Sequence, residues 1–314
     1  MNKKKSFIKI YTGLILFLIN LFFFFFFTWI DKKFNKIFFI YFCLFFILVI
    51  MICSVKEVLK SKQLLKNNFL KFIYFIFSFI FFYLFFLFLF CFYCNNPQLN
   101  DFSKIFSKKI YLPAQLIYLK QSFQLKQFLF YFFFLFIFLW FCFLFVNKFR
   151  TENLNFLLLI LIYIVLPSAC FFTLICLNYE WFVYLFVITI ANDSFAYLGG
   201  ILFGKHLLYP KISPKKTWEG SLCGVIISLI IVFCIFDRRL LINKLPFYIF
   251  TFCNCIIAQI GDLIASKFKR DFLIKDFDSL IPGHGGFLDR FDSLFFLSFF
   301  VIFILSIPRE FICF

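Results

Sequence analysis

The chain has only two histidines among its 314 residues, His206 and His284, and no serine, histidine and aspartate in a pattern typical of a catalytic triad. Hydrolysis through a covalent serine intermediate is therefore disfavoured. The sequence also lacks a visible internal repeat, and it has no long basic stretch with interleaved aromatic residues outside its apolar runs. Nucleic-acid binding is consequently not expected, although the net charge is +17.

Most of the lysines instead lie in short links between apolar runs, where positive charge sets membrane topology and meets anionic lipid head groups. Lys3–Lys5 precede the first apolar run in the manner of a secretory signal. However, no cleavage site with small residues follows that run, and the chain continues with Asp31, Lys32 and Lys33. We therefore expect the run to be retained as a first membrane span.

What the sequence does contain is apolar side chains. The hydrophobic fraction is 64% and 64 residues are phenylalanine, whereas a soluble domain is closer to half apolar. The runs Leu14–Phe27, Phe128–Val146 and Phe156–Leu177 contain no charge, and a run near or above about 18 apolar residues can cross a bilayer as a helix. The sequence therefore predicts an all-α, polytopic integral membrane protein.

The apolar runs predict about nine transmembrane helices, near residues 7–29, 37–55, 72–94, 128–146, 156–177, 181–203, 220–236, 245–265 and 291–307. Residues 1–180 are almost featureless hydrophobic spans, so we interpret residues 181–314 as the catalytic transmembrane region. If residues 1–6 are cytoplasmic, the parity of the spans places the loops 204–219 and 266–290 together on the cytoplasmic side. The lysine-rich link 56–71 then faces the same side.

A first group of polar residues begins at Asn192. Asp193 lies well inside a span, where an ionised carboxylate costs about 3 kcal/mol or more unless it is paired or hydrated; it has either a functional role or a structural partner. Ser213 and Pro214 read as an N-cap and a first helical position, so we expect a helix to begin there. Lys215 and Lys216 at such a helix start favour phosphate, although a lysine pair that only sets topology is an equal alternative.

A second group runs from Gly261 to Asp292. Helical spacing places Asp262, Ser266 and Lys269 on one stripe, so that a carboxylate, a hydroxyl and a cation follow one another towards water. Three glycines within residues 283–286 allow the close approach and positive φ of a phosphate-binding turn. Asp289 and Asp292 then share a helix face. Acids for a divalent metal, cations for phosphates and a glycine turn between them predict phosphoryl or nucleotidyl transfer.

The stretch from Ser266 to Asp292, with Lys275-Asp276, Pro282-Gly-His-Gly-Gly286 and Asp289-Arg-Phe-Asp292, resembles the motif of phosphatidate cytidylyltransferases, also called CDP-diacylglycerol synthases. Ser213-Pro-Lys-Lys-Thr-Trp-Glu-Gly220 is similar to a second block of that family, and the resemblance covers about residues 192–293. It implies that the phosphate of phosphatidic acid attacks the α-phosphate of CTP, giving CDP-diacylglycerol and pyrophosphate in phospholipid biosynthesis. It also implies Mg²⁺ as cofactor, with K⁺ as a further candidate ion of the metal centre.

Carried onto this sequence, the resemblance predicts a complete site. The metal ligands are expected to be Asp262 and Asp289, followed by Asp292 and Asp193. The cations for the CTP and lipid phosphates are Lys215, Lys216, Lys269, Arg270 and Arg290, of which the last three are expected to be catalytic together with Asp262 and Asp289. The remaining substrate contacts are expected from Ser213, Ser266, Lys275, Gly283, His284, Gly285 and Gly286. For His284, phosphate contact and simple loop hydrogen bonding are equal alternatives.

One departure from the family pattern is Asp278, where a small residue is common. It touches none of the proposed metal or phosphate groups, so we expect activity to be retained. The composition suits an AT-rich bacterial genome, so we expect a bacterial cytoplasmic (inner) membrane, with the active site on its cytoplasmic side. The resemblance also suggests a homodimer.

Other functions compete with this interpretation. A related CTP-dependent transferase could use another lipid acceptor, such as a prenyl-glycerol phosphate or a polyprenol. An ion-coupled transporter could use intramembrane Asp193 and Asp262, but it should show inverted hydropathy repeats, which we do not see. A structural protein without activity is disfavoured by the intact acids and cations.

Overall fold

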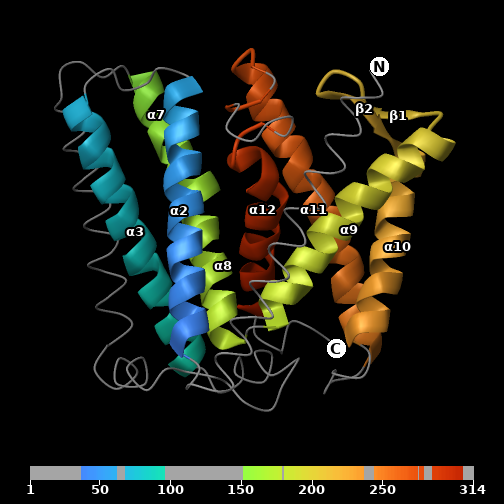
Figure 1. Cartoon of the computed structure of the whole chain (residues 1–314), viewed down its shortest axis with the longest axis horizontal. Helices are drawn as coiled ribbons and strands as arrows, with labels where there is room; N and C mark the ends of the chain where they lie inside the picture. The colour runs from blue at the N-terminus through green and yellow to red at the C-terminus, as the bar shows by residue number, and fades with distance from the viewer. Residues whose placement is uncertain are drawn as a thin grey trace.

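The computed structural model describes residues 37–61, 68–95, 151–178, 180–236, 244–274, 276–278 and 285–306. In chain order its elements are α2 (Ile37–Ser61), α3 (Asn68–Asn95), α7 (Thr151–Ile160), η1 (Leu161–Val165), α8 (Leu166–Leu177), α9 (Glu180–Phe203), β1 (Leu207–Tyr209), β2 (Ser213–Thr217), α10 (Trp218–Phe236), α11 (Lys244–Asp271) and α12 (Leu288–Leu305). The helices form a bundle, and the short β1–β2 hairpin lies at one end of it (Figure 1).

Six described segments are long and apolar enough to cross a membrane: 40–60, 70–90, 155–177, 180–203, 218–236 and 247–271. The prediction of an all-α polytopic membrane protein is therefore confirmed. The ninth predicted span corresponds to α12, whose first turns carry Asp289, Arg290 and Asp292. The predicted spans 7–29 and 128–146 lie outside the described residues, so the count of nine stays a prediction.

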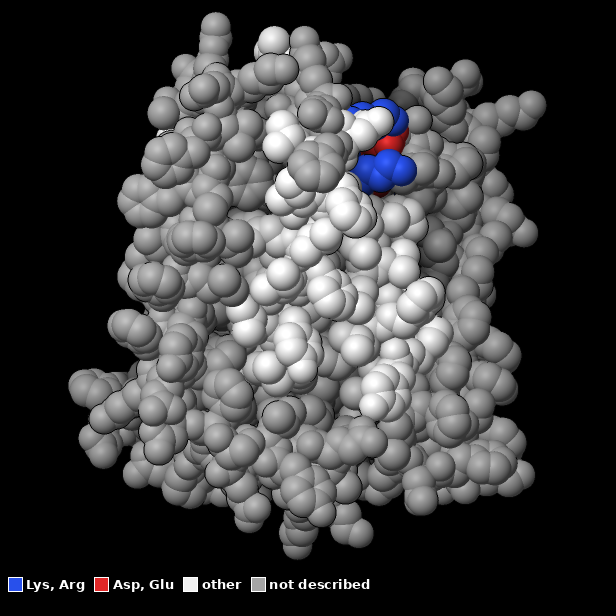
Figure 2. Space-filling model, turned by 90° about the vertical axis from the view of Figure 1, so that its left-hand side faces the viewer, with Lys and Arg blue, Asp and Glu red and all other residues white. Residues whose placement is uncertain are grey.

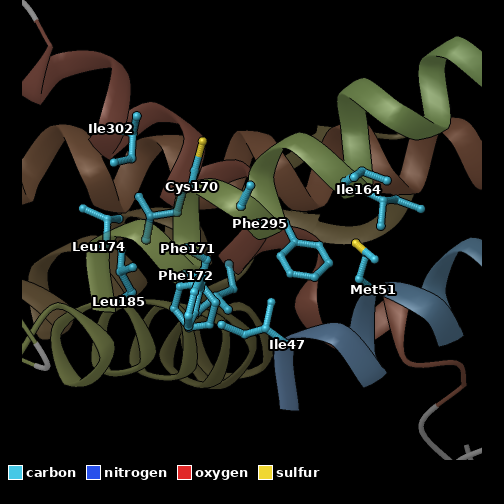
Figure 3. Packing of buried hydrophobic residues seen from close by; sticks show 14 of the residues in the cluster. Ile47, Met51, Ile164, Cys170, Phe171, Phe172, Leu174, Leu185, Phe295 and Ile302 are labelled. Atoms are coloured by element: carbon cyan, nitrogen blue, oxygen red, sulfur yellow. The ribbon is translucent and has the colours of Figure 1, made fainter. Parts of the chain in front are cut away.

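Helix α8 is the centre of the bundle. Its residues from Pro167 to Leu177 are all buried, and it packs against α2, α3, α9 and α12. Figure 3 shows Ile47 and Met51 of α2, Phe171 and Phe172 of α8 and Phe295 of α12 in one apolar cluster. Lipid tails are as apolar as these side chains, so close van der Waals packing, rather than removal from water, holds the spans together.

Helices α9 and α10 approach each other through small residues. A Cβ atom at Gly199 would lie 2.5 Å from the Cβ of Cys223, and one at Gly220 would lie 2.8 Å from the backbone nitrogen of Gly200. A larger side chain at either position would force the two helices apart, as at other membrane helix contacts built on small residues. This contact fixes the hairpin that connects the two helices.

A buried polar network joins α9 and α10 to α11. The side-chain amide of Asn192 donates to the carbonyl of Cys255 at 2.7 Å, and Gln259 donates to the Asn192 side chain at 2.8 Å and to the Ser221 carbonyl at 3.0 Å. The Ser221 hydroxyl also bonds Gln259. In lipid, such groups must be satisfied within the protein. The network therefore fixes the register of the helices that carry Asp193 and Asp262.

Charged residues gather at one end of the bundle. On the face in Figure 2 the charged side chains of the described residues lie at one end, and the rest of the described surface there is uncharged. The same end holds the last turn of α2, the β1–β2 hairpin, the last turn of α11 and the first turn of α12 (Figure 1). This arrangement agrees with the parity argument, which required the two polar loops to share a side.

Candidate active site

The centre of the charged end is an ion pair between Lys216 of β2 and Asp262 of α11. Their side chains are 29% and 26% exposed, so both groups are open to a ligand. Asp193 of α9 is exposed as well, and it interacts electrostatically with Asp262, Lys216 and Arg290. The structure thus brings together Asp193, Lys216, Asp262 and Arg290 from α9, β2, α11 and α12, all of which the sequence had predicted as site residues.

Asp292 of α12 belongs to the same cluster. Its side chain is buried, and it interacts electrostatically with Asp262, Asp193 and Lys269. One carboxylate oxygen accepts the backbone N–H of Ser293 at 2.7 Å. Three acids from α9, α11 and α12 therefore share one region with cations from β2, α11 and α12, as a site for a metal and phosphates requires.

The segment Ser213–Thr217 is a β-strand, so the prediction that a helix begins at Ser213 was wrong. It pairs antiparallel with β1, with Leu207 opposite Thr217. A residue before proline is driven to the extended region, and proline is tolerated in a two-stranded edge. The helix begins instead at Trp218, where the Thr217 hydroxyl accepts the Gly220 N–H at 3.2 Å as an N-cap.

Lys215 and Lys216 therefore do not lie at a helix N-terminus. Lys216 reaches Asp262 from the strand, whereas Lys215 is exposed. Glu219, in the first turn of α10, accepts the backbone N–H groups of Lys205 and His206 at 3.1 and 3.2 Å and contacts the His206 ring nitrogen Nδ1 at 2.6 Å. This carboxylate, which sequence reasoning did not single out, holds the chain where α9 ends.

Asp289 is enclosed, with a side chain only 3% exposed. One of its oxygens accepts a hydrogen bond from the Lys269 ammonium at 2.8 Å. The other accepts hydrogen bonds from the backbone N–H groups of Phe277 at 3.0 Å and Gly286 at 2.9 Å. Lys269 is 12% exposed and lies 5.7 Å from the centre of the Phe277 ring. The ion pair and the hydrogen bonds together offset the free-energy cost of burying this carboxylate. Asp289 thus organises the loop, and its role as a metal ligand stays a prediction.

Two glycines of the predicted turn are described. Gly285 has a φ of +85°, which L side chains rarely adopt and which the glycine-rich sequence predicted. A Cβ atom at Gly286 would collide with the carboxylate of Glu57. The turn therefore requires glycine at both positions. Gly283, His284 and Lys275 lie outside the described residues, so their roles stay predictions.

Glu57 of α2 is the main functional residue that sequence reasoning missed. It is 1% exposed and accepts the backbone N–H groups of Phe287 at 2.7 Å and Leu288 at 3.0 Å, and it thereby caps α12. Lys60, one turn later, forms a salt bridge of 3.1 Å with Asp278. The N-terminal spans are therefore not featureless, and the unusual Asp278 has a partner. The only signal in the sequence was an acid at the end of an apolar run.

The remaining predicted residues surround this core. Arg270 donates to the carbonyls of Ile212 and Ile274, each at 3.3 Å, and so ties the hairpin to the end of α11. Ser266 is half-buried one turn after Asp262, and Ser213 is half-buried in β2. Arg270 thus acts on the hairpin in this structure, and a direct phosphate contact by Arg270 or Ser266 stays a prediction.

The acids present suit a hard divalent cation, although within the described ranges no three His, Cys, Asp or Glu side chains form a ready-made metal site. Mg²⁺ is usually held by one or two carboxylates together with substrate phosphates and water. Asp262, which is partly exposed, and the neighbouring Asp292 supply carboxylates of this kind. The donor set therefore fits Mg²⁺ that is shared with phosphate oxygens of a ligand.

Comparison with known proteins gives a consistent result. The model of the cytidylyltransferase family matches residues 8–307. A phosphatidate cytidylyltransferase of Haemophilus influenzae is 44% identical over 131 residues, which are 39% of this chain and 46% of that protein. Those of Staphylococcus haemolyticus and Bacillus subtilis are each 37% identical, over 48% and 51% of this chain and 58% and 61% of their own length. The chain thus matches about half the length of these curated relatives.

Proposed function

The chain belongs to the cytidylyltransferase family, and we propose that it transfers a cytidylyl group from CTP to phosphatidic acid, giving CDP-diacylglycerol and pyrophosphate. The observation that carries this proposal is the cluster of Asp193, Asp262 and Asp292 with Lys216, Lys269 and Arg290, at one end of membrane-spanning helices. A charged site at that position can take a water-soluble nucleotide and a bilayer-bound phosphate at the same time. The names of the three relatives support the same substrates.

In the proposed reaction an oxygen of the lipid phosphate forms a bond to the α-phosphorus of CTP. The bond from that phosphorus to the oxygen that bridges to the β-phosphate breaks, and pyrophosphate leaves with the electron pair. The attacking phosphate is already an anion, so no strong base is required. The main tasks of the protein are to position two anions and to neutralise their charge.

The residues of the cluster fit these tasks. Asp262 and Asp292 would hold Mg²⁺, which when bound neutralises phosphate charge and orients the nucleotide; K⁺ is a further candidate ion. Lys216 pairs with Asp262 in this structure. With that carboxylate occupied as a metal ligand, the Lys216 ammonium would be available for a phosphate. Arg290 is exposed, interacts electrostatically with Asp193 and suits a second phosphate contact.

The proposed location is a bacterial cytoplasmic membrane, with the charged end facing the cytoplasm. Six described helices can cross a membrane, and the three relatives above come from bacteria. CTP is a cytoplasmic metabolite, so the charged end must face that side for the reaction to proceed.

The test is an assay of the purified full-length protein with radiolabelled CTP, Mg²⁺ and phosphatidate in mixed micelles. We expect labelled CDP-diacylglycerol, no labelled product with a polyprenol or a prenyl-glycerol phosphate, and a loss of at least about hundredfold in Asp262→Asn, as for removal of a central electrostatic group. Asp271→Asn, at an exposed position on the same helix, is the matched control. Product with another lipid but none with phosphatidate would contradict the proposal.

A further inference from the structure

Tyr163 has an unusual hydroxyl group. The oxygen is buried and has no hydrogen-bond partner among the residues that the structure describes. Other buried tyrosines have partners: the Tyr74 hydroxyl donates to the Leu157 carbonyl at 2.7 Å, and the Tyr93 hydroxyl donates to the Ile302 carbonyl at 2.7 Å. An unsatisfied buried hydroxyl costs about 1–3 kcal/mol. Such a hydroxyl is retained most readily where a ligand supplies the missing hydrogen-bond partner.

A local irregularity of the helix places this residue. Pro167 has no N–H group, and its ring conflicts with the carbonyl four residues earlier, which is that of Tyr163. The helix widens there into the π-turn η1, in which the Leu166 N–H bonds the Leu161 carbonyl. A π-turn inserts an extra residue into the helical turn and re-aims its side chains, and such turns often occur at functional sites.

The Tyr163 side chain lies between two different environments. It interacts electrostatically with Asp292, Asp262 and Asp289, which are acids of the site described above. Its ring packs edge-on against Phe268, with the ring centres 5.0 Å apart. It also lines a small apolar recess, about the size of one water molecule, together with Val58 of α2, Phe156 of α7, Phe268 of α11, Phe272 just after α11 and Leu288 of α12. The residue therefore stands at the border between the charged site and an apolar recess.

We propose that the Tyr163 hydroxyl donates a hydrogen bond to the phosphate of the lipid acceptor and so positions it for attack on CTP. This inference rests on the proposed function. A phosphate that is accompanied by cations can approach the acids, and its oxygens accept the proton of the hydroxyl. Tyr163 lies inside the segment Asn155–Leu177, which is long and apolar enough to cross a membrane, so a bilayer-bound phosphate is closer to it than a water-soluble nucleotide. Tyr163 thus discriminates between the two substrates of the reaction.

Tyr163→Phe and Tyr74→Phe form a matched pair for the test, because each removes one buried hydroxyl. The full-length protein would be used in nanodiscs of uncharged lipid. The measurements are the KM for phosphatidate, the KM for CTP, the thermal midpoint, and the calorimetric affinity for short-chain phosphatidate without CTP. A hydrogen bond to a charged group is worth roughly tenfold or more in affinity.

For Tyr163→Phe we expect the KM and Kd for phosphatidate to rise about tenfold, while the KM for CTP stays unchanged and the thermal midpoint rises, because an unsatisfied buried hydroxyl is removed. For Tyr74→Phe we expect the opposite pattern: a lower midpoint and unchanged constants, because its hydroxyl is already satisfied within the fold. A Tyr163→Phe variant that keeps wild-type constants, or that raises both KM values equally, overturns the inference. A wild-type protein that converts no phosphatidate overturns the proposed function instead.

Discussion

The two polar loops at the charged end hold their charges in different ways. At the hairpin, Lys216 forms an ion pair with Asp262 of α11, and both side chains remain more than a quarter exposed. Beside the loop before α12, Asp289 of α12 and Lys269 of α11 are almost fully enclosed, and the carboxylate accepts three hydrogen bonds. Groups of the first kind can exchange partners when a ligand arrives, whereas groups of the second kind hold a shape. The comparison teaches that charged residues predicted for the same site can serve different purposes, some binding a ligand and others holding the framework.

The largest loss of stability is expected when the enclosed carboxylate is removed. Asp289→Asn leaves Lys269 charged and buried without its partner, which should lower the free energy of unfolding by about 3–5 kcal/mol. Thermal unfolding in detergent would measure this loss. The double variant Asp289→Asn with Lys269→Met should recover part of the stability without recovering activity. An Asp289→Asn variant with wild-type stability and no activity would show instead that Asp289 serves the reaction directly.

A smaller effect is expected at the cap that α2 provides for this loop. Glu57→Ala leaves the N–H groups of Phe287 and Leu288 without an acceptor, so it should cost about 1–2 kcal/mol of stability. Activity should fall with it, because Asp292 lies in the helix that Glu57 caps. The control is Lys60→Ala, which removes a salt bridge whose lysine side chain is 68% exposed. A loss at Lys60 as large as that at Glu57 would contradict the capping role.

The smallest change in stability, with a clear change in binding, is expected in the hairpin. Lys216→Ala removes a partly exposed ion pair, so stability should change by no more than about 1 kcal/mol. The KM for CTP should rise at least about tenfold, because a charge-assisted phosphate contact is lost. Lys211→Ala, at an exposed position in the same hairpin, should leave both quantities unchanged. A stability loss in Lys216→Ala comparable to that in Asp289→Asn would remove the distinction between the loops.

Much of the site was predictable from the sequence because its residues are unusual for their surroundings. Asp193, Asp262 and Asp292 are acids in or next to apolar runs, where an acid is rare. The glycines and cations between residues 261 and 292 are typical of a phosphate-binding site. Span parity predicted only that the two polar loops share a side of the membrane, and the structure shows that the three acids converge. The strand at Ser213–Thr217 was missed because a serine before proline is compatible with either an N-cap or an extended segment. Only pairing with β1 resolves that ambiguity.

The sequence by itself determined that this protein is a helical membrane protein with a charged, oxygen-rich site, because hydropathy and side-chain chemistry are local properties. The tertiary structure alone decided which of these charges are enclosed and which are open. It revealed the bond between Glu57 and Phe287, 230 positions apart, and it placed Tyr163 of a π-turn beside acids of two other helices. Contacts of this kind depend on how helices pack, and the spacing of residues along one helix does not contain that information.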